Sequence, residues 1–458
     1  MSDFLGEDDD NFAYAGEGME EVEVDEGAPA DDESVADSDV DEGAEEVHEP
    51  VVDMSYACFR GHSDSVYCAA IHPSQPGVVL TGGGDDVAYL WRYKQSQEDS
   101  ENPTPGEAYS PIQLTGHTDT VTSVGFNFNG SLALTGAYDG TVRIWQVETG
   151  ALVQVLEGPE DVEWAQWHNK GNAIIAGSRD GTVWMWLTHN GQCVHVFAGH
   201  DGGVACGLFS QDGKSICTGG EDGTVRQWQP KTGACRHVFA GGAAMGGTGM
   251  GHEAEVTCLA GSADGDLVLS GSVDGTMRLY GLTAKRLLQT FVHSSTSSTA
   301  AAAGAMDTVR EGAEDEDEDE GDEVSGVECV GFAPGAFKWV ASGGADKALK
   351  VWDTVSGHLR CTCMHGGSVV ALSWHETQPV ICTAALDNLL RLWDARNGAL
   401  LIGLTGHSDL VTSFNLVPLN PLNTPPGAGE GYTDAVVSVS DDNTARVFLL
   451  NVAELISV

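Results

Sequence analysis

One eleven-residue pattern recurs along the chain and limits the available folds more than any other feature. It occupies residues 135–145, 218–228 and 270–280, and each copy runs from a Ser/Thr-Gly pair through Asp-Gly-Thr to a closing aromatic residue. A Gly-His pair precedes each copy, and 28 residues separate its histidine from the aromatic residue, as they also separate His365 from Trp393. Short apolar runs joined by Asp-Gly turns predict an antiparallel meander. Because one meander cannot bury both of its faces, several must stack around an axis.

The repeat unit resembles the WD40 repeat, with its Gly-His opening, its Asp turn and its closing Trp. The closing position occurs eight times, and an Asp lies six residues before it each time. The resemblance therefore implies an all-β fold, an eight-bladed WD40 β-propeller over residues 55–450. The closing residues are Trp91, Trp145, Trp186, Trp228, Tyr280, Trp352, Trp393 and Phe448.

Several repeats contain His, Ser/Thr, Asp and Trp together, a set that includes the residue types of a hydrolase triad. In WD40 repeats these side chains form a buried hydrogen-bond chain within each blade, and we assign them that structural role. Such a network stabilises a blade only when every member is bonded. We expect complete sets in repeats 1, 2, 4 and 7: His62, Thr81, Asp85, Trp91; His117, Thr135, Asp139, Trp145; His200, Thr218, Asp222, Trp228; His365, Thr383, Asp387, Trp393.

Other repeats depart from the pattern. Repeat 3 lacks both the His and the Ser/Thr, and repeat 6 has Glu323 at the His position, so we expect blades 3 and 6 to be less regular. Tyr280 and Phe448 alter the aromatic member of repeats 5 and 8. Trp164 and Trp167 add aromatic area to blade 3, either in its core or on a contact surface.

Acidic residues are concentrated in two segments. The formal net charge is -48; residues 1–53 hold 22 Asp/Glu and no Lys or Arg, and residues 307–323 hold 11 acidic residues against Arg310 alone. Runs of like charge repel one another and stay hydrated. We therefore predict a disordered acidic tail at 1–53 and a disordered acidic insertion at 294–323. The last repeat lacks its outermost strand, and Tyr56–Phe59 is predicted to supply it, so that the N-terminal segment closes the last blade.

The charge also bears on partners. The phosphates of nucleic acid and of anionic membranes would be repelled, so we expect neither to bind directly, and a basic protein segment is the natural electrostatic partner. No apolar run approaches a membrane span of about 18 residues.

Motifs for enzyme chemistry are not found. The near match to a phosphate-binding loop at 207–215 has one residue too many between its glycines. No Cys/His cluster has zinc spacing and no nucleophile has an activating base outside the structural sets, so we predict no enzyme activity, no cofactor and no metal. The 11 cysteines, scattered among apolar neighbours, are typical of reduced thiols in a cytoplasmic or also nuclear protein, which we expect to be a monomer.

Features outside the repeat consensus resemble the angio-associated migratory cell protein family. In chain order they are the acidic tail, Thr81–Trp91, Asp161–His168 with Trp184–Trp186, the acidic loop before blade 6, and Leu390–Arg396. The resemblance implies a cytosolic, non-enzymatic WD40 protein. Fungal relatives of the family are dedicated chaperones of a basic large-subunit ribosomal protein of the L10/L16 type, and animal members are tied to cell migration. We therefore hypothesise a chaperone or escort in ribosome biogenesis.

Two alternatives stay open. Trp393-Asp394-Ala395-Arg396 resembles the Trp-Asp-x-Arg box of substrate receptors of cullin-4 ubiquitin ligases. The other alternative is a general signalling or cell-migration scaffold, in which the acidic segments serve only solubility.

The WD40 resemblance also implies where a partner binds. Partners on the top face of such propellers touch the residue three positions after the loop His and the residue just before the turn Asp. Several of these positions are acidic here. The residues that we predict to bind a basic segment are Tyr138, Asp161, Glu221, Glu253, Glu255 and Asp441, with Arg179 a basic exception.

Overall fold

The computed structural model describes residues 52–75, 77–93, 109–241, 249–294, 325–335, 337–419 and 432–457. All of them belong to one compact unit, residues 50–458. The predicted acidic tail lies outside the described residues except for Val52 and Asp53, and the predicted acidic insertion lies outside them except for Ser294.

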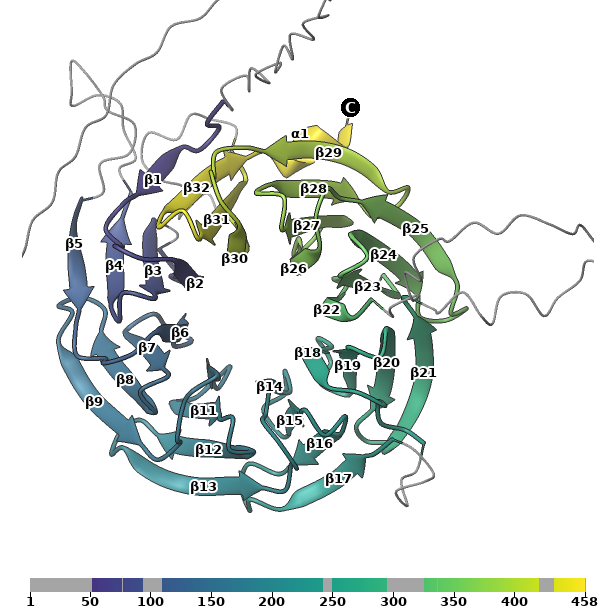
Figure 1. The fold of residues 1–458 in the computed structure, drawn as a ribbon, viewed down its shortest axis with the longest axis horizontal. Coiled ribbons are helices and arrows are strands. Elements are labelled where there is room, and N and C mark those ends of the chain that lie inside the picture. Colours follow the sequence, from purple (N-terminus) through teal and green to yellow (C-terminus); the bar gives the residue numbers. More distant parts are fainter. Residues whose placement is uncertain are drawn as a thin grey trace, which may run out of the picture. The chain divides into compact units, whose positions relative to one another are not determined.

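The strands form eight four-stranded antiparallel sheets arranged in a ring (Figure 1). Each sheet is a meander whose strands we call a to d, from the centre of the ring outward. The predicted eight-bladed propeller is confirmed.

Blades 1 to 4 have the following strands. Blade 1 contains β2 (Val66–Ile71), β3 (Val78–Gly83), β4 (Ala88–Arg92) and β5 (Tyr109–Leu114). Blade 2 contains β6 (Val121–Phe126), β7 (Leu132–Ala137), β8 (Thr141–Gln146) and β9 (Leu152–Glu157). Blade 3 contains β10 (Trp164–Trp167), β11 (Ala173–Gly177), β12 (Thr182–Leu187) and β13 (Gln192–Ala198). Blade 4 contains β14 (Cys206–Phe209), β15 (Ile216–Gly219), β16 (Val225–Trp228) and β17 (Cys235–Phe239).

Blades 5 to 8 continue the ring. Blade 5 contains β18 (Val256–Gly261), β19 (Leu267–Ser272), β20 (Thr276–Gly281) and β21 (Arg286–Val292). Blade 6 contains β22 (Val327–Phe332), β23 (Trp339–Gly344), β24 (Ala348–Asp353) and β25 (Leu359–Met364). Blade 7 contains β26 (Val369–Trp374), β27 (Val380–Ala385), β28 (Leu390–Asp394) and β29 (Ala399–Leu404). Blade 8 contains β30 (Val411–Pro418), β31 (Asp434–Ser440), β32 (Ala445–Leu450) and, from the other end of the chain, β1 (Ala57–Phe59).

The core lies between the blades and along their second strands. Strands β3, β11, β15, β27 and β31 are buried at every residue. A strand b has partners on both edges and a neighbouring blade on each face, so it consists of small and apolar residues throughout rather than alternating. Cys217 and Cys382 lie in two of these strands, and burial raises the pKa of the Cys217 thiol to about 12. All 11 cysteines are free.

The turn between strands b and c needs a left-handed residue directly after its Asp. Glycine takes this place in blades 2 to 5; Gly140 has a φ of 75°, and a Cβ there would lie 2.6 Å from the carbonyl oxygen of Pro159. Asp or Asn, which tolerate this conformation, take it in three further blades, and Lys347 takes it in blade 6 with a φ of 63°. The recurring Asp-Gly of the sequence therefore reflects a backbone requirement of the turn.

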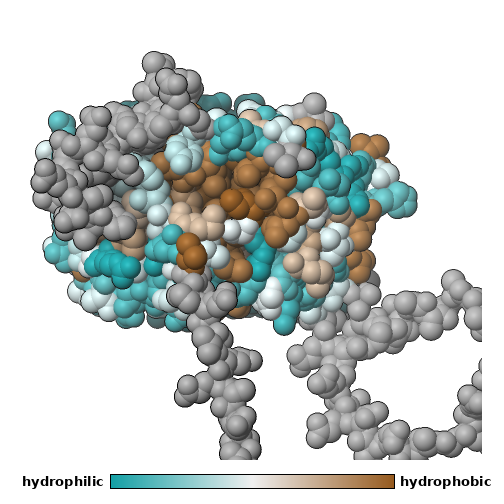
Figure 2. Space-filling model, turned by 90° about the horizontal axis from the view of Figure 1, so that it is seen from above, coloured by the Kyte–Doolittle hydropathy of each residue, from teal (hydrophilic) through white to brown (hydrophobic). Residues whose placement is uncertain are grey.

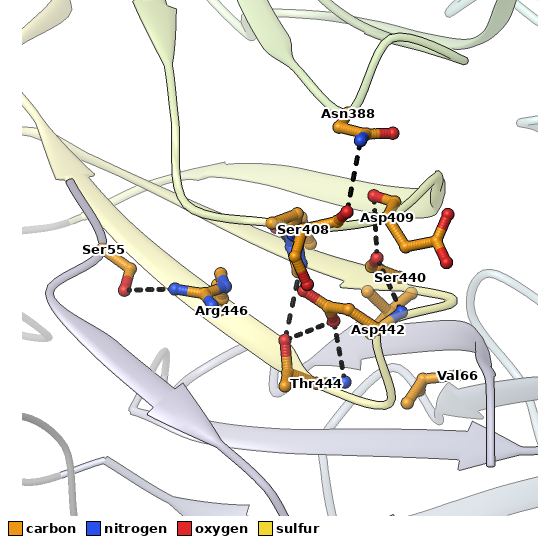
Figure 3. Close-up of polar contacts among 12 residues, drawn as sticks. Ser55, Val66, Asn388, Ser408, Asp409, Ser440, Asp442, Thr444 and Arg446 are labelled. Atoms are coloured by element: carbon orange, nitrogen blue, oxygen red, sulfur yellow. Dashed lines mark hydrogen bonds and ion pairs between the residues drawn. The ribbon is translucent and has the colours of Figure 1, made fainter. Parts of the chain in front are cut away.

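The ring is closed by the N-terminal segment, which supplies strand d of blade 8 (Figure 3). In the β1–β32 pair, Ala57 lies opposite Val447 and Phe59 opposite Ala445. The Arg446 side chain forms an ion pair with Asp53 and donates to Ser55 Oγ at 3.3 Å. Residues far apart in the sequence thus hold the two ends of the ring together.

Apolar side chains gather on part of the outer wall of the ring (Figure 2). The short helix α1 (Val452–Ser457) contacts β29. Leu455 and Ile456 of the helix and Leu401 and Ile402 of the strand pack on one buried cluster, which includes Val452. The helix thus extends the core of blade 8 onto the outside of blade 7. None of the helices in the described part of the chain is long and apolar enough to cross a membrane.

Candidate protein-binding site on the inner rim of the top face

Hydrogen-bonded sets hold the top of most blades. In blade 2, His117 Nδ1 lies 2.9 Å from Asp139, His117 Nε2 lies 2.7 Å from Thr135 Oγ1, and Trp145 Nε1 donates to the same hydroxyl at 2.9 Å. Blade 4 repeats this set with His200, Asp222, Thr218 and Trp228. The four side chains bond to one another, which leaves their polar atoms committed to the fold rather than to catalysis.

Two of the expected complete sets are incomplete. In blade 1, His62 contacts Asp85 and Thr81, but the buried Nε1 of Trp91 has no partner. In blade 7, Asp387 pairs with Arg391 at 2.8 Å, and the buried Nδ1 of His365 is left without a partner.

Blade 7 lacks a threonine that supports the set in four other blades. In blades 2, 4, 5 and 8 a threonine two residues after the turn Asp bonds that carboxylate and lies close to the histidine, as Thr224 does with Asp222 and His200. Leu389 stands at this position in blade 7 and bonds Asp387 only through its backbone. The Asp387 carboxylate bonds Arg391 instead of the histidine. Blades 1 and 6 also lack the threonine, with Val87 and Ala348 in its place, yet keep the contact between Asp and His.

Blade 6 is regular, contrary to expectation. His293 supplies the imidazole, with Nδ1 2.7 Å from Ser342 Oγ and Nε2 3.0 Å from Asp346, and Trp352 donates to the same serine. The insertion follows this histidine instead of preceding it, so counting back from the Asp led to Glu323, which lies outside the described residues.

Blade 3 is irregular, as its sequence predicts. Without a histidine, the turn is held from the inner rim by Asp161: its Oδ1 accepts from Ser178 Oγ at 2.9 Å and from the Arg179 backbone N–H at 2.8 Å. The carboxylate that we predicted to bind a partner is thus engaged in holding the turn of its own blade.

Acidification is expected to destabilise the propeller through these sets. Burial alone would raise the pKa of the turn carboxyls, but bonds from histidine, threonine and backbone N–H groups lower it below the ordinary value in Asp139, Asp222, Asp274 and Asp442. The stability that they contribute is present above the unfolded pKa of about 3.9 and is lost as the pH falls toward the folded pKa. Burial also lowers the pKa of His252 and His365, so a smaller loss begins below about pH 6.5.

Calorimetry between pH 8 and pH 2.5 measures this dependence. We expect a constant unfolding midpoint down to about pH 6.5, a slight fall to about pH 4 and a steep fall below it. The variant Asp139→Asn should show a shallower acid limb. A midpoint at pH 3 equal to that at pH 7 would contradict the expectation.

The inner rim of the top face is built on a ring of buried valines. One valine begins the innermost part of every blade, and all eight are fully buried: Val66, Val121, Val162, Val204, Val256, Val327, Val369 and Val411. We call "inner rim" the residue before each valine, the residue after it, and the residue before the turn Asp. In seven blades the last of these donates its backbone N–H to the carbonyl of the first, as Glu221 does to Gly203 and Val273 to Glu255. The inner-rim positions of a blade are therefore adjacent.

Carboxylates gather on the inner rim of blades 3 to 6. We call Asp161, Glu163, Glu221, Glu255 and Glu328 the acidic arc. Burial raises the pKa of Glu255, and the negative charges of Glu221, Glu328 and Glu163 raise it further. Glu221 is anchored, because its Oε2 accepts the Gly203 backbone N–H at 2.9 Å. The arc thus places five carboxylates from four blades beside one inner-rim cation, Arg179, and carries excess negative charge.

The predicted binding residues divide into two groups. Tyr138, Asp161, Glu221 and Glu255 lie on the acidic arc or contact it; the Tyr138 hydroxyl lies 3.4 Å from Glu163 Oε2, and burial together with the Glu163 charge raises the Tyr138 pKa. The other two lie elsewhere. Glu253 is exposed next to the loop histidine of blade 5 and bonds Asp274 through its backbone, and Asp441 is on the inner rim of blade 8.

Sequence reasoning missed two members of the arc, Glu163 and Glu328. Each directly follows an inner-rim valine, and side chains on either side of a strand residue point to the opposite face from it. This alternation along the strand was a sequence signal from which both glutamates could have been predicted. Glu163 also accounts for the basic exception, since Arg179 pairs with it at 3.1 Å. In the described part of the chain, no group of three or more His, Cys, Asp or Glu is arranged to hold a metal ion.

Comparison with known proteins agrees with this architecture. The family of the WD domain, G-beta repeat, matches residues 54–92, 110–146, 150–186, 191–229, 246–281, 322–353 and 356–394. Human angio-associated migratory cell protein is 34% identical over 396 residues, which cover 86% of this chain and 80% of that protein, and the dog protein matches equally. The chain belongs to the WD40 family and, within it, to that of angio-associated migratory cell protein.

Solved structures of other WD40 proteins have the same fold. Sqt1 of Saccharomyces cerevisiae superimposes with a TM-score of 0.69 at 20% identity, over 87% of this chain and 99% of that one. Chaetomium thermophilum Sqt1 bound to the N-terminus of the ribosomal protein L10 gives 0.66 at 22% identity, over 87% and 100%. The seven matched repeats of this WD40 chain leave strands a to c of blade 8 unmatched. Residues 420–431 separate the described parts of strands a and b of that blade.

The extra tryptophans of this WD40 protein join blade 3 to its neighbours. Trp164 donates to the carbonyl of Val204 at 2.7 Å, and Trp167 donates to the carbonyl of Gly125 at 3.2 Å. A Cβ on Gly207 would lie 2.1 Å from the Trp164 ring, so this glycine makes room for it. Both tryptophans therefore pack between blades, in the core, which is the first of the two interpretations given in the sequence analysis.

Arg396 lies on the opposite face of the propeller, in the turn between β28 and β29. Its guanidinium, 50% exposed, bonds both carboxylate oxygens of the buried Asp394, at 2.6 Å for the shortest contact. A partner that used Arg396 would have to share it with this carboxylate. The ubiquitin-ligase alternative stays a hypothesis.

Proposed function

We propose that this WD40 protein is a non-enzymatic escort for a basic large-subunit ribosomal protein of the L10/L16 type, acting as a monomer in the cytoplasm. The observation that carries the proposal is the acidic arc, in which the pKa of Glu255 is raised by its burial and by three neighbouring carboxylates. A cationic segment bound there would relieve this repulsion. A free ribosomal protein, strongly basic and prone to aggregate, is a partner with that need.

Two further observations support the proposal. A structural neighbour, Chaetomium thermophilum Sqt1, was solved with the N-terminus of the ribosomal protein L10 bound to it. The acidic segments at 1–53 and 307–323 would add a long-range field that attracts a basic partner and raises its association rate. The alternative within the family, a cell-migration scaffold, would not require an acidic arc.

The proposal predicts salt-sensitive binding. A fluorescent peptide from the basic N-terminus of the source organism's L10-type protein is titrated into the full chain at 50 mM and at 500 mM salt. We expect binding at low salt that weakens about tenfold or more at high salt, because exposed charges are screened beyond a few ångströms at that ionic strength. The control is a peptide in which the residue order is scrambled and each charged residue is replaced by one of the opposite charge. Failure to bind at 50 mM, where electrostatic contacts are strongest, would remove the proposal.

A further inference from the structure

The inner rim has two unlike halves. Blades 3 to 6 contribute the acidic arc, with Val273 of blade 5 as an exposed apolar exception, whereas blades 7, 8 and 1 place apolar residues at corresponding positions. We call Leu386, Leu410 and Tyr67 the apolar arc: Leu386 precedes the turn Asp of blade 7, Leu410 precedes the inner-rim valine of blade 8, and Tyr67 follows that of blade 1. Tyr67 occupies the same strand position as Glu163 and Glu328. Asp441 shares blade 8 with Leu410, so one carboxylate also lies in this half.

Two of the three members of the apolar arc are exposed in the free protein, and Leu410 is partly buried. Tyr67 is 43% and Leu386 41% exposed. The residues directly before Tyr67 and Leu386 are Val66 and Ala385, which fill the core on the other side of the chain. Neither Tyr67 nor Leu386 can therefore turn inward. The Tyr67 ring lies over Gly84 at the top of blade 1, 3.3 Å from where a Cβ on that glycine would be. Two large apolar side chains are thus held at the rim without being buried.

A purely cationic segment would leave this half uncovered. Apolar area removed from water is a main source of binding energy, while charges mainly set specificity and association rate. In the ring of eight blades, blade 1 with Tyr67 lies opposite blade 5 with Glu255 (Figure 1). Blade 7 with Leu386 lies opposite blade 3 with its two carboxylates, and adjoins blade 6. One segment that crosses the ring can satisfy both.

We infer that the partner segment is bipartite: its cationic side chains bind the acidic arc, and a large aliphatic or aromatic side chain farther along binds the apolar arc. The inference rests on the proposed function and adds the partner's sequence pattern. Sheets stack about 10 Å apart, so eight inner strands make a ring at most about 25 Å across. An extended segment that rises about 3.3 Å per residue crosses it in about five to seven residues, which is the expected spacing between the cations and the apolar residue.

A double-mutant cycle tests the inference. The protein carries Tyr67→Ser with Leu386→Ser, and the L10-type peptide is made in its natural form and with its large apolar residues changed to serine. We expect about tenfold weaker binding from either change, and little further loss from both together, because they remove the same contact. The salt dependence should stay as in the unchanged pair, since no charge is altered.

Matched controls separate the possible outcomes. Leu400→Ser with Val355→Ser removes apolar side chains that are also exposed, but on the outer wall and on a blade 6 turn, and should leave the affinity unchanged. If the natural peptide binds the wild-type chain and neither the serine peptide nor the rim variant binds more weakly, the bipartite pattern is wrong and the escort proposal stands. If the natural peptide does not bind at all, the escort proposal itself fails. The serine peptide is also measured against the wild-type chain, so its result tests the inference even if the rim variant does not fold.

Discussion

Changing Glu221 and Glu255 to glutamine together is expected to weaken binding of the basic peptide about 100-fold, or about 2.8 kcal/mol. Each glutamate would lose a charge-assisted hydrogen bond to a cation, and such bonds contribute about 1.5 to 3 kcal/mol. Both residues belong to the acidic arc, and the pKa of Glu255 reports their mutual repulsion in the free protein. Fluorescence anisotropy at 50 mM salt measures the change, and the slope of affinity against salt should become shallower.

The same double variant should fold at least as well as the wild-type chain. The Glu255 carboxylate is held with its pKa raised, so neutralising it removes repulsion and should stabilise the free protein slightly, by no more than about 0.5 kcal/mol at this partly exposed site. Loss of binding with an unchanged or higher unfolding midpoint would therefore locate the effect at the site rather than in the fold.

A charge-matched control excludes a general electrostatic effect. Glu148→Gln with Glu376→Gln makes the same change in net charge at exposed positions in the connections of the opposite face. We expect less than a threefold loss of affinity there. If both double variants weaken binding equally, the acidic arc is no more than part of a diffuse negative field, and the peptide has no defined site on the inner rim.

The sequence was sufficient for the fold because the repeat encodes local requirements. The turn Asp and the residue after it are fixed by hydrogen bonds and by a left-handed φ, both within a few residues of the chain. The closing aromatic residue is set by its place at the end of strand c. Such features can be counted, and eight of them predicted eight blades.

The sequence failed where the position of a residue depends on a distant segment. His293 could not be assigned to blade 6, because the insertion after it separates it from the strand that follows its loop. The predicted partner of Asp387, His365, was wrong, because Arg391 lies only four residues from Asp387 and takes its carboxylate. The acidic arc unites four blades, and the membership of Glu163 and Glu328 follows from the strand on which each side chain lies.

Replacing Phe59 by alanine is expected to open the ring locally and to lower the unfolding free energy by about 3 to 5 kcal/mol. Phe59 is 4% exposed and stacks on Trp91 of blade 1, with ring centroids 4.9 Å apart and planes within 6°. It belongs to β1, whose three residues are the only strand contribution of the N-terminal segment to blade 8 within the described part of the chain. Without the Phe59 ring, the three residue pairs between β1 and β32 must hold together segments that are nearly 400 residues apart in the sequence.

Phe197→Ala is the matched control for ring closure. Phe197 ends strand d of blade 3 in the same way, is equally buried, and packs on Trp228 of the next blade at 5.5 Å. Its truncation should lower the global stability by a similar amount, because the cavity is alike. The strand around it has seven residues and continues directly from strand c, so it has no reason to detach on its own.

Hydrogen exchange distinguishes the two variants. In Phe59→Ala the backbone amides of residues 56–59 should exchange by local opening, at a free energy well below that of global unfolding, while the amides of the b strands keep their protection. In Phe197→Ala the amides of β1 should remain protected. If the β1 amides of Phe59→Ala exchange only with global unfolding, then Arg446 with its partners Asp53 and Ser55 is sufficient to close the ring, and the stacked aromatic pair contributes packing alone.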